Sequence, residues 1–158
     1  MDARRITETF AVAGQLQPDD MQAAAEAGYT TVINNRPDHE GGPEQPTAQA
    51  CAQAAEAAGL AYHYLPMTPD QLSPELVSSF QQALKESSGP VLAHCKSGPR
   101  SLVLWGLAQV CHEGREIDTV LEEAYAQGFD ISHLKPLFQA FQQQAGALSR
   151  AERRDVAR

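Results

Sequence analysis

A short polar loop enclosed by two apolar runs is the feature that most constrains how this chain folds. The eight residues at 94–101, His-Cys-Lys-Ser-Gly-Pro-Arg-Ser, follow Pro-Val-Leu-Ala and precede Leu-Val-Leu-Trp. A short apolar run of this length is typical of a buried strand. The pattern therefore predicts a strand at 91–94, a tight loop that carries one cysteine and one arginine, and a helix at 100–112.

Strands and helices alternate along the rest of the chain. The other expected strands are 9–13, 30–34 and 61–65, and the other expected helices are 17–28, 46–59, 73–84, 117–127 and 134–144. Alternation of this kind favours parallel pairing of the strands. The predicted fold is α/β in three layers, with a central, mostly parallel sheet of four to five strands flanked by helices.

The length of 158 residues is that of one domain with its own core, which we expect to span residues 1–145. Residues 146–158 contain four arginines and little apolar content, and are interpreted as a basic C-terminal tail or linker. A frayed helix end is the simpler interpretation, and a basic interaction tail is the alternative.

Composition narrows the classes of function. The net charge of -8 argues against a nucleic-acid or membrane-surface partner, so an anionic substrate has to be attracted by a local positive site. Three cysteines suit a reducing, cytoplasmic compartment better than a disulfide scaffold. The five histidines lack metal-ligand spacing, no apolar stretch is long enough to span a membrane, and no signal core follows the N-terminus. We expect no metal and no cofactor.

Three loops are expected to meet at one edge of the sheet. Ligands of parallel sheets bind beyond the carboxyl ends of the strands. This rule gathers the segments 35–38, 66–70 and 95–100 at that edge, so the first two segments are expected to face the third.

The loop residues suit thiolate chemistry. A free cysteine has a pKa of about 8.5, and a helix N-terminus together with Lys96 and Arg100 favours the anion of Cys95. The Arg100 guanidinium can grip two oxygens of a phosphate or sulfonate. Gly98 lets the backbone curl, and Ser101 is expected to donate a hydrogen bond to the sulfur. The simpler alternative is a buried structural cysteine beside a helix-capping arginine, and core positions are expected for the other two cysteines.

Three segments carry a family resemblance: 31–38 (Thr-Val-Ile-Asn-Asn-Arg-Pro-Asp), 62–66 (Tyr-His-Tyr-Leu-Pro) and the loop at 94–101. The pattern resembles the protein tyrosine and dual-specificity phosphatase superfamily. It is most similar to the phosphatase-like domain of the bacterial beta-lactamase hydrolase-like family. The resemblance covers roughly residues 4–144 and implies a tyrosine-phosphatase-like fold.

The resemblance also implies roles for the loop residues. Cys95 is the expected nucleophile, Arg100 the oxyanion ligand, and His94 a support that tunes the thiolate. A cradle for the anion is expected from the segment that comprises Lys96, Ser97, Gly98, Pro99, Arg100 and Ser101.

An aspartate on a neighbouring loop protonates the leaving oxygen in the superfamily. Asp70 lies where the dual-specificity enzymes carry theirs, and Asp38 is its rival. The simpler interpretations are a loop acid near a helix start for Asp70 and a turn residue for Asp38. Arg36 is interpreted either as a substrate contact at the sheet edge or as a salt-bridged loop arginine.

Two departures from the superfamily keep alternatives open. Tyrosine phosphatases place five residues between Cys and Arg, whereas four lie between Cys95 and Arg100. The smaller family that the chain resembles shares this short loop, and so do rhodanese-type sulfurtransferases. Pro99 also removes one amide donor from the cradle. The first hypothesis is a phosphatase that hydrolyses phosphate monoesters, from small anions or phosphoproteins, through a cysteinyl-phosphate. The second is a sulfurtransferase that moves sulfane sulfur from thiosulfate or glutathione persulfide, and the third is a non-enzymatic anion-binding domain.

Overall fold

The computed structural model describes the backbone of residues 1–157 and the side chains of residues 1–146. Its strands are β1 (Arg4–Thr7), β2 (Phe10–Ala13), β3 (Thr31–Asn34), β4 (Ala61–Tyr64) and β5 (Val91–His94). They form one sheet in the order β1-β2-β5-β3-β4, in which only the β1–β2 pair is antiparallel. The predicted α/β fold with a mostly parallel sheet of four to five strands is confirmed.

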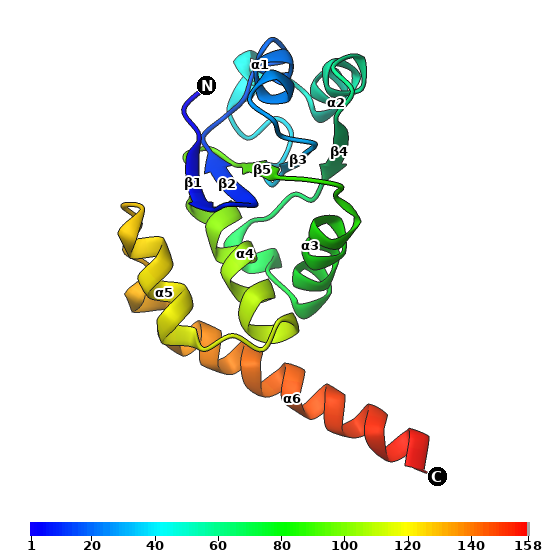
Figure 1. Ribbon diagram of the computed structural model, residues 1–158, viewed down its shortest axis with the longest axis vertical. Coiled ribbons are helices and arrows are strands. Elements are labelled where there is room, and N and C mark those ends of the chain that lie inside the picture. Colours follow the sequence, from blue (N-terminus) through cyan, green and yellow to red (C-terminus); the bar gives the residue numbers. More distant parts are fainter. Residues whose placement is uncertain (158) are drawn as a thin grey trace.

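Helices cover both faces of the sheet (Figure 1). The helices are α1 (Asp20–Glu26), α2 (Ala48–Ala57), α3 (Pro74–Glu86), α4 (Pro99–His112), α5 (Ile117–Ala126) and α6 (Lys135–Ala157). The first two pack on one face over a cluster of mostly small apolar side chains. The other four lie on the opposite side, where a larger cluster with aromatic side chains forms the main core.

The central strand β5 is buried along its whole length, as expected for a strand covered by helices on both faces. Its last residue, His94, is in register with Ala13 at the end of β2 and with Asn34 at the end of β3. Three parallel strands therefore end at the same level, and the loops that follow them start side by side.

Three single-turn 3-10 helices lie in the connections: η1 (Gly42–Glu44), η2 (Pro69–Gln71) and η3 (Ser132–Leu134). Ser73 caps the start of α3, because its hydroxyl accepts a hydrogen bond from the Leu76 amide at 3.1 Å.

The N-terminal strand was not expected from the sequence. β1 is a four-residue edge strand with two arginines, and only its Ile6 side chain is buried. A register irregularity between Arg5 and Thr7 further breaks the alternation that identifies strands. Short edge strands with charged side chains protect a sheet from pairing with another chain, and the same features hide them from pattern recognition.

The last helix is longer than the predicted 134–144. Pro136 is its second residue, where proline is tolerated, and the backbone remains helical through Ala157 (Figure 1). The division into a domain at 1–145 and a basic tail or linker at 146–158 stays a prediction, since the arginine side chains of that tail lie outside the described residues. Within the described part of the chain, no helix combines the length and the apolarity that crossing a membrane requires.

Candidate active site

Cys95 follows the last residue of β5 and is 1% exposed. Its amide donates to the Ala13 carbonyl at 3.3 Å, which continues the pairing of β5 with β2 by one residue. The Gly98 amide donates to the Cys95 sulfur at 3.1 Å. The loop thus curls back so that one backbone donor, the Gly98 amide, faces the sulfur.

Gly98 has a left-handed backbone conformation, with φ of 113°. Glycine adopts such a conformation without the steric cost that a Cβ brings. A Cβ built here would lie in ordinary contact with the Phe129 ring, at 3.4 Å. The glycine is therefore needed for the turn, and Phe129 covers it.

The helix α4 starts at Pro99, directly after the curl. The amide of Leu102 donates to the Gly98 carbonyl at 3.1 Å, so the first helical turn begins at the loop itself. Pro99 lacks an amide hydrogen at a position where helices leave it unpaired in any case. The positive end of the α4 dipole is thereby placed beside the Cys95 sulfur.

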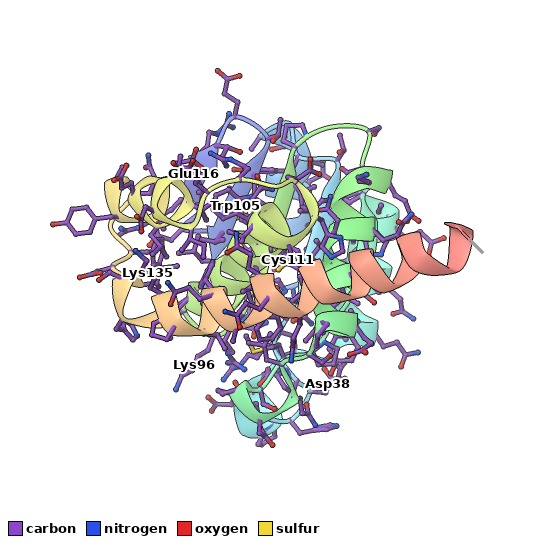
Figure 2. All side chains as sticks on the ribbon, turned by 90° about the horizontal axis from the view of Figure 1, so that it is seen from below. Asp38, Lys96, Trp105, Cys111, Glu116 and Lys135 are labelled. Atoms are coloured by element: carbon purple, nitrogen blue, oxygen red, sulfur yellow. The ribbon has the colours of Figure 1, made fainter. Side chains whose placement is uncertain are left out.

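Two residues at the apex of the loop are open to solvent. Lys96 and Ser97 are both exposed, and the Lys96 carbonyl accepts a hydrogen bond from the Gln15 amide at 3.2 Å. In Figure 2 Lys96 and Asp38 lie toward the same side of the molecule, away from Glu116. Backbone contacts hold the loop while the Lys96 ammonium stays in water.

Arg100 does not point into an empty site. Its Nη2 and Nη1 atoms donate to the two carboxylate oxygens of Glu40 at 2.7 and 2.9 Å, and Nη1 also donates to the Met67 carbonyl at 3.0 Å. Arg36 Nε donates to the same carboxylate at 3.0 Å. An internal carboxylate therefore occupies the bidentate fork that was predicted to bind an oxyanion.

The two guanidinium groups fix the charge of Glu40. The hydrogen bond from Arg100, reinforced by Arg36 and opposed by partial desolvation, lowers the Glu40 pKa to about 2. The carboxylate in turn raises the pKa of Arg100. Glu40 was not singled out in the sequence. Its position four residues after Arg36, in a loop at the carboxyl edge of the sheet, was the available signal.

Arg36 makes the contacts of a salt-bridged loop arginine. Its side chain is mostly buried, pairs with Glu40, and donates from Nη1 to the Gln15 side-chain oxygen at 3.1 Å. The sequence left open whether Arg36 contacts substrate or is a salt-bridged loop arginine, and the structure shows the contacts of a salt-bridged arginine.

Asn35 ties the three loops together. The Ser101 hydroxyl donates to Asn35 Oδ1 at 2.8 Å, and Asn35 Nδ2 donates to the Leu65 carbonyl at 2.8 Å. The Asn35 backbone also accepts from the Met67 amide and donates to the His94 carbonyl. The predicted meeting of the three loops is confirmed, with Asn35 as a support that sequence reasoning missed, although the residue lies in one of the segments that carry the family resemblance.

The expected hydrogen bond from Ser101 to the sulfur is wrong. The hydroxyl donates to Asn35 instead, because the first turn of α4 directs it toward the β3 loop, where a buried amide oxygen needs a donor. Ser101 therefore holds the base of α4 against the neighbouring loop.

The two candidate acids lie in different surroundings. The carboxylate of Asp38 accepts a hydrogen bond from the Ala48 amide at 2.8 Å and so holds the start of α2. Asp70 is exposed in η2, and among residues 1–146 no side-chain hydrogen bond fixes its carboxylate. Its segment is connected to the loop through the bond from Arg100 to the Met67 carbonyl.

His94 lies at the end of β5 and is completely buried. Burial lowers its pKa to about 4. Neither ring nitrogen has a hydrogen-bond partner among the described residues. A neutral imidazole thus lies directly before the cysteine.

The other two cysteines lie on helices. Cys51 is a residue of α2 and belongs to the small apolar cluster, whereas Cys111 is half-buried near the end of α4, about 18 Å from the start of that helix at 1.5 Å per residue. A disulfide requires Cα atoms within about 7 Å, so Cys111 does not pair with Cys95 in this structure. All three cysteines are free. Within the described residues, no group of three or more His, Cys, Asp or Glu side chains is arranged to hold a metal ion.

Comparison with known proteins places these features in a family context. Residues 2–112 match the model of the family described as beta-lactamase hydrolase-like protein, phosphatase-like domain. A beta-lactamase hydrolase-like protein of Xylella fastidiosa is 39% identical over 126 residues, which cover 80% of this chain and 29% of that protein. This chain therefore spans less than a third of the length of that relative.

Solved structures show the same architecture. A Neisseria meningitidis protein provisionally assigned as a phosphatase is 30% identical, with a TM-score of 0.72 over 89% of this chain and 96% of that chain. PTPMT1 in complex with PI(5)P is 13% identical, with a TM-score of 0.71 over 93% of this chain and 98% of that chain. The tyrosine-phosphatase-like fold that the resemblance implied is confirmed.

Proposed function

Because the chain belongs to the family of beta-lactamase hydrolase-like phosphatase-like domains, we propose that it is a cysteine-dependent hydrolase of phosphate monoesters. The observation that carries this proposal is the loop geometry. The Cys95 sulfur accepts a backbone hydrogen bond from Gly98 at the N-terminus of α4, and Arg100 emerges from the first turn of the same helix. A thiolate is stabilised there by an amide and a helix dipole.

The reaction has two displacements at phosphorus. The Cys95 thiolate forms a sulfur–phosphorus bond while the ester oxygen leaves with the bonding electron pair. Water then attacks the cysteinyl-phosphate, the thiolate leaves, and inorganic phosphate is released. Loop amides and Arg100 are the groups available to stabilise the equatorial oxygens.

Arg100 has to exchange partners during this cycle. In the absence of substrate its fork holds Glu40, and a phosphoryl group binding to the fork takes over one or both of those hydrogen bonds. Glu40 keeps Arg36 as a partner when this happens, so the carboxylate is not left uncompensated.

The identity of the proton donor sets the range of leaving groups. Glu40 is ionised at neutral pH, and the Asp38 carboxylate is engaged at α2, which leaves Asp70 as the proposed general acid. Asp70 is exposed in η2, so it is available to a substrate at the loop mouth. Esters of acidic alcohols such as phenols depart with less need for this acid than alkyl esters do.

Sulfur transfer is the second candidate function. It is favoured by the four-residue spacing from Cys95 to Arg100 and by the lack, among the described residues, of a buried carboxyl group held at the loop. In this reaction Cys95 attacks the sulfane sulfur of thiosulfate and sulfite leaves with the bonding pair. A thiol acceptor then attacks the outer sulfur of the Cys95 persulfide, and the Cys95 thiolate leaves. Sulfite is a good leaving group and needs no acid.

Parallel assays on one preparation separate the two functions. We expect hydrolysis of an aryl phosphate, no turnover with Cys95→Ser, and a loss of roughly tenfold or more with Asp70→Asn when the leaving group is an alkyl alcohol. Asp118→Asn is the matched control, because Asp118 is an exposed acid that pairs with Lys135 at the far side of α5. A stable Cys95 adduct of one sulfur mass after thiosulfate, without phosphatase turnover, would replace the first proposal by the second.

The PTPMT1 complex with PI(5)P supports a phosphorylated small molecule as the type of substrate. Phosphoproteins are the other source of phosphate monoesters. We propose the small-molecule class for this chain, because the Cys95 sulfur lies in a narrow loop whose surroundings include an apolar groove.

A further inference from the structure

An apolar groove of about 580 Å³ lies beside the loop. It begins at Pro99 and Arg100 and continues along the first turns of α4. Its walls are mainly aliphatic and come from three separate parts of the chain: Met67 and Leu72 around η2, Val103 on α4, and Phe129, Leu134 and Leu137 from the α5–α6 region.

The volume and the lining are those of a ligand site. Small-molecule sites measure about 300–1,000 Å³ and combine apolar walls with a few polar groups. Here Leu72, Phe129, Leu134 and Leu137 pack against the main core on one side and remain partly exposed on the other. An apolar ligand that covers these side chains gains the free energy of removing them from water.

The groove and the loop share residues. Pro99 and Arg100 form the end of the groove and also the start of α4, one residue after Gly98. Phe129 lines the groove and also covers Gly98. A molecule whose anionic head lies at the loop therefore has the groove as the adjoining surface for its body.

Charge favours one place for the head of an anionic ligand. The groove is lined by the Arg100 guanidinium at the loop and by the Asp130 carboxylate, which accepts hydrogen bonds from the Ser132 amide and hydroxyl. An anionic head is attracted to the first and repelled by the second. The head is therefore expected at Arg100, and the aliphatic part of the ligand on the apolar walls.

We propose that this groove binds an aliphatic chain of the substrate, so that the substrate is an amphiphile with a tetrahedral anionic head at Arg100 and an alkyl or acyl body along Leu72 and Leu137. The inference rests on the proposed function for the position of the head. Phosphate monoesters and thiosulfonate-type sulfane-sulfur donors share such a head, whereas persulfides do not, and the test distinguishes the two kinds of head.

The experiment measures binding of non-hydrolysable anions by calorimetry, with methyl-, butyl- and octylphosphonate and the matching alkylsulfonates. Burial of a methylene group contributes about 0.8 kcal/mol, so the affinity is expected to rise about threefold to fourfold per methylene until the groove is filled. Higher affinity for the phosphonates than for sulfonates of the same length assigns the head to phosphate esters. Higher affinity for the sulfonates assigns it to sulfane-sulfur donors.

A matched pair of variants tests whether the rise in affinity with chain length arises in the groove. Leu72→Asn places a polar group in the groove wall and is expected to reduce the gain in affinity per methylene. Leu76→Asn makes the same change at a partly buried leucine on α3 outside the groove, and is expected to keep the slope of the wild-type protein. If Leu72→Asn does not fold, Leu137→Phe narrows the groove without adding a polar group and is expected to weaken octylphosphonate more than methylphosphonate.

Three results would contradict the groove inference or the proposed function. If the protein binds methylphosphonate but the affinity does not rise with chain length, the groove inference is overturned and the proposed function stays intact. An equal slope for the wild-type protein and Leu72→Asn also overturns it, because the chain is then bound elsewhere. Failure to bind any short phosphonate or sulfonate contradicts the oxyanion site itself, and with it the proposed function.

Discussion

The loops that follow β5 and β3 lie side by side, but the first is held in shape mainly by its backbone and the second mainly by side chains. The β5 loop is short and shaped by its backbone, through the curl at Gly98 and the start of α4 at Pro99. The β3 loop, residues 35–47, is long and held by side chains, among them Asn35, Arg36 and Asp38. One loop carries Cys95, the proposed nucleophile, and the other holds the groups around it in place.

This difference predicts how the two loops respond to substitution. A loop shaped by its backbone is expected to keep its shape and lose activity when a functional side chain is changed. A loop held by side chains is expected to lose its shape when one of several hydrogen-bond partners is removed.

Arg100→Lys is expected to cause the largest loss of activity. Lysine keeps the positive charge but cannot offer two parallel donors to one anion, so turnover should fall about 100-fold or more while the fold is retained. Steady-state kinetics and a thermal melt measure the two quantities. As the control, Arg115→Lys changes an arginine paired with Glu123 outside the site and should leave turnover unchanged. A similar loss in both variants would contradict a role for Arg100 in binding the anion.

Asn35→Ala is expected to destabilise the protein by about 1–3 kcal/mol, because it leaves the Leu65 carbonyl without its side-chain donor and the Ser101 hydroxyl without its acceptor. Urea denaturation measures the change in the free energy of unfolding. Ser101→Ala removes only one of these two hydrogen bonds and should cost less. Equal losses for the two variants would show that the bond to Leu65 contributes nothing.

The Glu40 interactions are expected to contribute roughly 1 kcal/mol, a small effect because the carboxylate is partly exposed and screened by solvent. The folded pKa of about 2 lies below the ordinary value of 4.5, so this stability is present above pH 4.5 and is lost as the pH falls toward 2. Urea midpoints of the wild-type protein and Glu40→Gln should therefore differ at pH 6 and converge near pH 2. A difference that persists unchanged at pH 2 would contradict the assignment.

The contrast between the loops also shows how far the sequence can be interpreted. Strand β5, the curl at Gly98 and the start of the next helix follow from local patterns, since apolar runs, glycine and proline act through the backbone at their own positions. All parallel strands of the sheet were predicted for the same reason. The meeting of the loops followed from the rule that parallel strands end at one edge.

The side-chain hydrogen bonds around the loop could not be predicted from the sequence. Glu40 reaches Arg100 across 60 positions, and Ser101 reaches Asn35 across 66 positions. No local pattern encodes which of several polar residues at one edge will pair. The partner of Ser101 was predicted wrongly because the sulfur was the only acceptor that the sequence placed near it.

Under the proposed function, any anion that binds Arg100 must displace the Glu40 carboxylate from its bidentate contact. A small monovalent ion such as chloride offers one contact point and is a weak competitor for the guanidinium fork. A tetrahedral dianion offers two oxygens and more charge, and is the stronger competitor. In the proposed enzyme, Glu40 thus acts as an internal competitor that excludes weakly binding anions.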